Sequence, residues 1–303
     1  MIIIYPDYVS SGASYLADKL GIESVEVKTR TFPNKEVLVR ISDVEKIKGV
    51  DKAILYFPTY PETNDRIMHL LQTLEVVSYY NDSAYKILIS PYLSYSRQDK
   101  RFLEGESLSL KLYLDILCHL GLNHIVVFDV HNLDSFKKYV CCDYTHFSLF
   151  TPLVEKIIKI HDMDPKKLIL VAPDMGRLET VEELSKHFGS DYMYLEKSRD
   201  RYTGEIIMKL PEEIDLTRYD YALIIDDEIS TGGTMSSAIN HLKRVGAKTV
   251  IAAAIHLLLV SNADDRLFKA GVDYLYGTNT IYNPYSILDI EEILVDNRDN
   301  WLG

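Results

Sequence analysis

The stretch from residue 221 to residue 242 constrains the fold most, because it predicts a strand, a glycine turn and a helix in direct succession. The apolar run 221–225 ends in the acids Asp226 and Asp227, and residues 231–234, Thr-Gly-Gly-Thr, then precede helically spaced apolar residues. Paired glycines let the backbone take positive φ and approach a ligand, while N–H groups at a helix N-terminus attract phosphate. The stretch therefore predicts a phosphate-binding turn with two carboxylates beside it. A tight turn without a ligand is the alternative, and it would leave two acids at a buried strand end without a role.

The alternation of segments along the chain predicts an α/β protein. Apolar runs of strand length alternate with longer segments of helical period, which is typical of mostly parallel sheets flanked by helices. The chain has 303 residues, and at ~150 residues per domain this indicates two similar domains, residues 1–148 and 149–303. Whether the tail from about residue 283 packs on the first domain is left open. The expected strands are 2–5, 52–57, 86–90, 124–129, 168–172, 192–195, 221–226 and 249–255, and the clearest helices are 67–80, 108–120, 153–160 and 236–245.

Charge and cysteine content exclude several classes of function. The formal net charge of −12 argues against sequence-independent binding of nucleic acid, which depends on basic patches. The N-terminus has no basic region and no apolar run long enough for a signal peptide or a membrane span. The three cysteines, Cys118, Cys141 and Cys142, are an odd number without CxxC spacing. We therefore expect reduced thiols in a cytoplasmic protein, without nucleic-acid or membrane partners.

Two clusters of aromatic and polar residues could bind a nucleotide. Phe32, Asn34 and Glu36 precede an alternating strand pattern and could present an aromatic face and two polar groups to a purine. On these residues alone, a plain hairpin turn is the better interpretation. Arg97 and Gln98 follow a buried strand, at the edge where open α/β sheets bind ligands. A guanidinium suits phosphate and an amide suits a base edge, and a solvated loop with scattered ion pairs explains the pattern equally well.

Two further strand ends carry groups that could hold a metal-bound nucleotide. Asp129 and His131 end a predicted strand, and their spacing of two places both side chains on the same side. Asp174 ends another strand beside Gly176 and offers an oxygen to Mg²⁺. A single histidine is more often structural than a ligand, so His131 taken alone favours a structural role.

Taken in order, these clusters resemble the motifs of the ribose-phosphate diphosphokinases, the family of phosphoribosyl-pyrophosphate (PRPP) synthetases. The segment 226–234 resembles the PRPP loop that this family shares with phosphoribosyltransferases, with Glu228 in a position that is often apolar and Ser230 in place of a frequent aspartate. The resemblance runs from about residue 1 to about residue 280. The other matching words are Phe32-Pro33-Asn34-Lys35-Glu36 for Phe-x-[Asp/Asn]-x-Glu, Ser96-Arg97-Gln98-Asp99 for Ala-Arg-Gln-Asp, Asp129-Val130-His131 for Asp-x-His, and the segments Asn64-Asp65, Pro173-Asp174-Met175-Gly176 and Thr278-Asn279-Thr280.

The resemblance implies two phosphoribosyltransferase-like domains and transfer of the diphosphoryl group of ATP to the 1-hydroxyl of ribose 5-phosphate, giving PRPP and AMP. It implies Mg²⁺ as the cofactor, and a homo-oligomer, because the family builds its ATP site partly from the Phe-x-Asn-x-Glu loop of a neighbouring subunit. It assigns the catalytic role to Lys197 and Arg199, which would stabilise charge on the transferred group. By position it assigns metal binding to His131 and Asp174, ATP binding to Phe32, Asn34, Lys35, Glu36, Arg97, Gln98 and Asp99, and ribose 5-phosphate binding to Arg199, Asp226, Asp227, Ser230, Thr231, Gly232, Gly233 and Thr234.

Two other functions fit parts of the sequence. A phosphoribosyltransferase would use the same PRPP loop but would have no use for the clusters at 32–36 and 97–98. A non-catalytic subunit that regulates a synthetase would keep the fold, but the retention of Lys197, Arg199 and His131 speaks against it. We therefore expect the synthetase.

Overall fold

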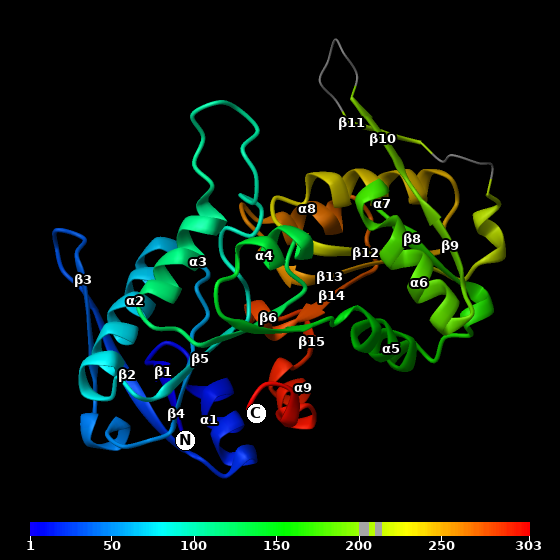
Figure 1. Cartoon of the computed structure of the whole chain (residues 1–303). Coiled ribbons are helices and arrows are strands. Elements are labelled where there is room, and N and C mark those ends of the chain that lie inside the picture. Colours follow the sequence, from blue (N-terminus) through cyan, green and yellow to red (C-terminus); the bar gives the residue numbers. More distant parts are fainter. Residues whose placement is uncertain (200–205, 210–213) are drawn as a thin grey trace. The chain divides into compact units, whose positions relative to one another are not determined.

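The computed structural model of the chain describes residues 1–199, 206–209 and 214–303, with only the backbone described at residues 10, 197–199 and 206–209. The chain divides into two compact units, which are residues 1–148 with 289–303 (unit 1) and residues 149–288 (unit 2). Each unit contains a mostly parallel sheet flanked by helices, so the predicted fold class is confirmed (Figure 1). Among the helices of the described residues, none is long and apolar enough to cross a membrane.

Unit 1 is built on a seven-stranded sheet with the strand order β3-β2-β1-β4-β5-β6-β7. The pair of β2 and β3 is antiparallel and the other pairs are parallel. Helices cover both faces of a parallel sheet, so its central strands are buried on both sides and appear as continuous apolar runs in the sequence. Its elements are β1 (Ile2–Pro6), α1 (Ser10–Leu20), β2 (Glu23–Thr31), β3 (Val37–Ile41), β4 (Lys52–Tyr56), α2 (Thr63–Tyr80), β5 (Tyr85–Ser90), α3 (Ser109–His119), β6 (His124–Phe128), α4 (Leu133–Tyr139), β7 (Asp143–Phe147) and α9 (Ile290–Asp296).

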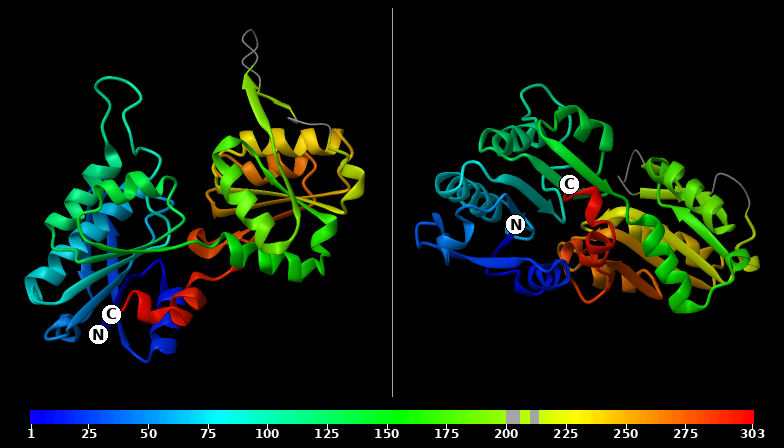
Figure 2. Two further views of the ribbon diagram at one scale, coloured as in Figure 1. Left: turned by 45° about the vertical axis from the view of Figure 1, so that its right-hand side comes forward. Right: turned by 60° about the horizontal axis from the view of Figure 1, so that its bottom comes forward.

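The last residues of the chain belong to unit 1. Helix α9 lies beside α1 (Figure 2), and the phenol of Tyr56 donates a hydrogen bond to the buried carboxylate of Glu291 at 2.5 Å. Trp301 is 1% exposed, and its indole N–H donates to the carbonyl of Leu294. These contacts make the C-terminal segment part of the hydrophobic core of unit 1.

Unit 2 is built on a six-stranded parallel sheet with the order β15-β14-β13-β12-β8-β9, and the antiparallel strands β10 and β11 form a separate two-stranded sheet. The apolar strands β12 and β13 lie at its centre, and α7 covers them through buried residues such as Ala238 and Leu242. Its elements are α5 (Phe150–His161), β8 (Leu168–Ala172), α6 (Leu178–Phe188), β9 (Asp191–Tyr194), β10 (Glu196–Arg199), β11 (Ile206–Lys209), β12 (Tyr221–Ile229), α7 (Gly233–Arg244), β13 (Thr249–Leu257), α8 (Ala263–Lys269), β14 (Tyr274–Thr278) and β15 (Ser286–Leu288).

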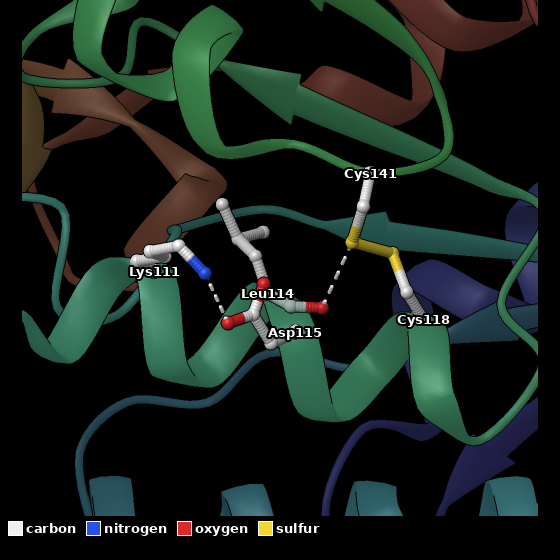
Figure 3. The surroundings of a disulfide bond; sticks show 5 residues. All are labelled: Lys111, Leu114, Asp115, Cys118 and Cys141. Atoms are coloured by element: carbon white, nitrogen blue, oxygen red, sulfur yellow. Dashed lines mark hydrogen bonds and ion pairs between the residues drawn. A yellow bond between two sulfur atoms is a disulfide. The ribbon is translucent and has the colours of Figure 1, made fainter.

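The prediction of reduced cysteines is wrong for two of the three. Cys118 at the end of α3 and Cys141, which follows α4, form a disulfide in unit 1 (Figure 3). Their Cα atoms lie 6.2 Å apart, within the range that a disulfide spans. The fold brings together residues that are 23 positions apart, which cysteine spacing alone does not indicate. Cys142 is the remaining free thiol, and burial raises its pKa to about 11.

Candidate active site

The glycine turn between β12 and α7 has the geometry of a phosphate-binding loop. Gly232 is left-handed, with φ of 73°, and α7 begins at the next residue. A Cβ atom at Gly232 would lie 3.3 Å from the Cβ of Ala263, so a larger residue would be strained by the left-handed backbone and crowded against α8. The first-turn N–H groups of a helix have no partner within the helix, and together with the helix dipole they attract anions. The turn is therefore suited to a phosphate group.

Side chains from α7 and α8 hold this turn in place. Arg266 on α8 donates a hydrogen bond to the carbonyl of Thr231 at 2.6 Å. The hydroxyls of Ser236 and Ser237 both donate to the carbonyl of Gly233, at 3.1 and 3.0 Å. These contacts leave Thr231 exposed, with Ser230 and Thr234 half-buried beside it. Sequence reasoning missed Arg266, because its position 35 residues after Thr231 gives no local signal.

Asp226 and Asp227 precede the turn, but they lie inside β12 rather than at its end as predicted. The strand continues to Ile229 because it pairs with β13 up to Leu257, whereas its pairing with β8 stops at Ile224. The two acids thus lie on the part of β12 that extends beyond its pairing with β8. This places them near the carboxyl edge of the sheet, where open α/β sheets bind their ligands.

A single arginine from the neighbouring strand-end loop contacts both acids. Arg177 follows β8, and its Nε lies 3.4 Å from Asp226 Oδ1 while its Nη2 lies 2.9 Å from Asp227 Oδ2. Burial, and then repulsion by Asp227, hold the pKa of Asp226 well above its usual range, and Arg177 opposes this rise. Sequence reasoning missed Arg177 as well, although a basic residue three positions after the strand-end Asp174 was a signal that could have found it.

The residues expected to bind ATP lie in unit 1, in two separate loops. Phe32, Asn34, Lys35 and Glu36 form the hairpin turn between β2 and β3, closed by the N–H of Phe32 donating to the carbonyl of Glu36 at 2.8 Å. Asn34, Lys35 and Glu36 are exposed, and Phe32 is half-buried. The guanidinium of Arg30 lies 4.6 Å from the centre of the Phe32 ring. The hairpin that the residues alone favoured is therefore present, and it presents the polar side chains to solvent.

The second of these loops follows β5. Arg97 and Gln98 are exposed, while Asp99 between them and α3 is buried. The backbone of Gln98 is fixed, because its N–H donates to Tyr95 and its carbonyl accepts from Leu110. The loop therefore holds its two solvent-facing side chains on an ordered backbone.

The two residues expected to bind metal lie in different units. In unit 1, β6 ends at Phe128, and Asp129 has a positive φ of 32°, which breaks the strand alternation. Asp129 is consequently buried and His131 exposed, so the prediction that both face the same side of a strand is wrong. In unit 2, the N–H of Gly176 donates to Asp174 Oδ1 at 2.9 Å. Across the described parts of the chain, no group of three His, Cys, Asp or Glu side chains is arranged to hold a metal ion.

Lys197 and Arg199 lie in β10, whose backbone pairs with β11, Lys197 opposite Met208 and Arg199 opposite Ile206. Their side chains lie outside what the structure describes. The expected catalytic role of these two residues therefore stays a prediction.

Comparison with known proteins extends over both units. Family models match the N-terminal domain of ribose phosphate pyrophosphokinase at residues 2–121 and the phosphoribosyl transferase domain at residues 144–284. The ribose-phosphate pyrophosphokinase of Saccharolobus solfataricus is 36% identical over 294 residues, covering 96% of this chain and 97% of the relative. That of Pyrococcus furiosus is 35% identical over 292 residues, covering 93% and 96%. The crystal structure of phosphoribosylpyrophosphate synthetase from Mycobacterium smegmatis is similar with a TM-score of 0.83 and 25% identity, covering 97% of this chain and 96% of that one.

The α/β units and the glycine turn after the paired acids define a protein of the phosphoribosyltransferase structural class. The relatives match along almost the whole chain and not in the second unit alone. The chain therefore belongs to the ribose-phosphate pyrophosphokinase family.

Proposed function

We propose that this protein is a ribose-phosphate diphosphokinase, which converts ATP and ribose 5-phosphate to PRPP and AMP. The observation that carries the proposal is the phosphate-binding turn at the start of α7, in a chain whose similarity to ribose-phosphate pyrophosphokinases extends through both units. In this reaction the 1-hydroxyl oxygen of the ribose forms a bond to the β-phosphorus of ATP. The bond from that phosphorus to the α,β-bridging oxygen breaks, AMP leaves with this oxygen, and the hydroxyl proton is released.

Ribose 5-phosphate binds at unit 2 in this proposal. The turn formed by Ser230, Thr231, Gly232, Gly233 and Thr234 receives the 5-phosphate, because its N–H groups and the N-terminus of α7 supply partial positive charge. Asp226 accepts hydrogen bonds from the ribose hydroxyls, and Asp227 supports it from a more buried position. The main contribution of the sugar site to the rate is to place the 1-hydroxyl in line with the β-phosphorus, because a positioned nucleophile needs orientation more than a strong base.

ATP binds with residues of unit 1. The exposed Arg97 and Gln98 contact phosphate and base, and Asp99 supports their loop from its buried position. The hairpin with Phe32, Asn34, Lys35 and Glu36 supplies the adenine contacts. Because its three polar residues face solvent, we propose that this hairpin reaches the ATP site of a second copy, which makes the protein a homo-oligomer.

Lys197 and Arg199 stabilise the negative charge that develops on the transferred diphosphoryl group. Removing one such positioned charge typically lowers the rate by ~10²–10³. Arg199 also contacts ribose 5-phosphate in this proposal.

The donor atoms in the chain fit Mg²⁺ when ATP supplies further oxygens. Mg²⁺ is commonly held by one or two carboxylates together with substrate phosphates. Asp174 has one oxygen committed to the N–H of Gly176, and its Oδ2 has no hydrogen-bond partner within the described residues. Asp174 would therefore offer a ligand to the ion from unit 2, and His131 is the metal ligand proposed in unit 1. Bound Mg²⁺ would neutralise charge on the β- and γ-phosphates.

We propose a cytoplasmic location, where both substrates are available. The Cys118–Cys141 disulfide does not contradict it, since disulfides also occur in some intracellular proteins, notably those of hyperthermophiles.

The test is a product assay with ATP, ribose 5-phosphate and Mg²⁺, in which AMP and PRPP are separated by chromatography. We expect the wild type to form both in equal amounts, and Lys197→Ala to reduce the rate ~10²–10³-fold. Lys186→Ala is the matched control, because Lys186 is an exposed lysine of α6 that forms an ion pair with Glu182 of the same helix. It should leave the rate unchanged.

The alternative functions give different results in the same assay. A folded wild-type protein that binds ATP but forms no AMP would be a regulatory subunit. A protein that binds PRPP but not ATP would be a phosphoribosyltransferase.

A further inference from the structure

The loop after β8 directs an arginine toward the paired acids of β12. Residues Met175–Arg177 form a short 3₁₀ turn, and Asp174 caps it by accepting a hydrogen bond from the N–H of Gly176. Helix α6 begins at the following residue, which fixes the backbone of Arg177 on both sides. The Arg177 side chain is 17% exposed, so most of it is held inside unit 2. Such an arginine is a fixed part of the site and not a solvated surface charge.

Arg177 bridges two carboxylates that would otherwise repel each other. Its Nη2 lies 2.9 Å from Asp227 Oδ2, and its Nε lies 3.4 Å from Asp226 Oδ1. The planar guanidinium carries several N–H groups in a rigid fork, so it can contact two carboxylates at once, which a lysine ammonium does less well. Removing one partner from a buried ion pair leaves an uncompensated charge, which is far more destabilising than breaking an exposed pair.

The two acids differ in what they can offer to a ligand. Asp227 is 7% exposed and has both oxygens engaged, Oδ1 with the N–H of Glu228 at 3.0 Å and Oδ2 with Arg177. Asp226 is 20% exposed, and its Oδ1 accepts from the N–H of Asp227 at 2.9 Å. The carboxylate that can still reach a sugar hydroxyl is therefore that of Asp226, and Asp227 is its buried neighbour.

We propose that Arg177 is a positioning residue for ribose 5-phosphate: it uses Asp227 as an anchor and orients the carboxylate of Asp226 toward the ribose hydroxyls. The inference rests on the proposed function, because it names the part of the ribose site that fixes the sugar. Arg177 does not need to touch the substrate. Its effect is on the binding of ribose 5-phosphate and not on the binding of ATP, because both of its ion pairs are with the acids expected to contact the ribose.

The experiment compares Arg177→Met, Arg177→Lys and a control, Arg244→Met. Arg244 is an arginine of α7 in the same unit, which contacts His241 and not the paired acids. Calorimetry measures the Kd for ribose 5-phosphate without ATP, and steady-state kinetics measure KM for both substrates. We expect Arg177→Met to weaken ribose 5-phosphate binding ~10- to 100-fold, the value of a hydrogen bond to a charged group, with KM for ATP unchanged within about twofold. Arg177→Lys should restore part of the loss, and Arg244→Met should behave as wild type.

Unchanged ribose 5-phosphate affinity in a folded Arg177→Met protein would overturn the inference, and so would an equal rise of KM for both substrates. If Arg177→Met does not fold, the double variant R177M/D227N removes both charges of the buried pair. It should fold and still bind ribose 5-phosphate weakly, because Asp226 has lost its orientation, and wild-type affinity in the double variant would overturn the inference. A wild-type chain that fails to bind ribose 5-phosphate would refute the proposed function as well, so the two failures are distinguishable.

Discussion

Breaking the disulfide between Cys118 and Cys141 should destabilise unit 1 by a predictable amount. The bond closes a loop between residues 23 positions apart, joining the end of α3 to the segment before β7 (Figure 3). In the chain-entropy model, closing such a loop removes about 11 cal/mol/K from the unfolded chain, or roughly 3.4 kcal/mol at room temperature. This corresponds to a roughly 300-fold change in the ratio of folded to unfolded protein. The disulfide is not the only interaction that holds α3 in unit 1, because Leu114 and Leu117 of this helix also lie in the hydrophobic core.

The single tryptophan of the chain provides the assay. Trp301 is buried in unit 1, so its fluorescence during guanidinium denaturation follows the unfolding of that unit. With a denaturant slope of roughly 4 kcal/mol/M, the expected loss lowers the midpoint by about 0.9 M. The double variant C118S/C141S should unfold at the midpoint of the reduced wild type, and Cys142→Ser should leave the effect of reduction intact.

Thiol titration of the denatured protein supplies an independent count. Without reductant, Cys142 alone should react, and after reduction all three cysteines should react. Equal midpoints for the oxidised and reduced proteins would refute the reasoning about the loop. Three reactive thiols before reduction would show that the disulfide is not formed.

Three further predictions concern unit 1, the phosphate-binding turn and the paired acids. Tyr56→Phe removes a hydrogen bond to the buried carboxylate of α9 and should lower the unfolding free energy by about 1.5–3 kcal/mol, measured by Trp301 fluorescence; a change below about 0.3 kcal/mol would contradict this. Gly232→Ala should weaken ribose 5-phosphate binding about tenfold in calorimetry. The control Gly189→Ala has a similar φ of 71° and no atom near its added Cβ, so it should lower stability without changing the affinity. Equal losses of affinity in the two variants would refute the role of the turn. Because burial raises the pKa of Asp226, the affinity for ribose 5-phosphate should fall as the pH is lowered through that raised pKa, well above the ordinary value of about 4; an identical pH profile in D226N would assign the fall to the substrate phosphate instead.

The sequence predicts the architecture well because parallel strands leave a strong pattern. Strands such as β4 and β5 are buried on both faces, so they appear as uninterrupted apolar runs between helical segments. The glycine turn is equally legible, since Gly232 takes a positive φ that few other residues adopt. Local patterns of this kind depend on neighbours in sequence, which is why they can be predicted.

Features that depend on tertiary contacts were missed. The disulfide joins residues that the folding of α4 brings onto α3, and cysteine spacing does not indicate it. The loop conformation at Asp129 turns His131 to solvent, which strand alternation does not foresee. Arg177 and Arg266 act on the candidate site through contacts with residues 35 or more positions away. The paired acids and the glycine turn were therefore identified from the sequence, and the arginines that contact them were missed.

The most direct test of the proposed function follows the β-phosphorus of ATP. The wild-type protein is incubated with ribose 5-phosphate, Mg²⁺ and ATP labelled in the β-phosphate, and the labelled products are separated. Diphosphoryl transfer predicts that the label appears in PRPP, with an equal amount of unlabelled AMP and no labelled ADP. Label found in ADP, or in free pyrophosphate without PRPP, would contradict the assignment of this chain as a diphosphokinase.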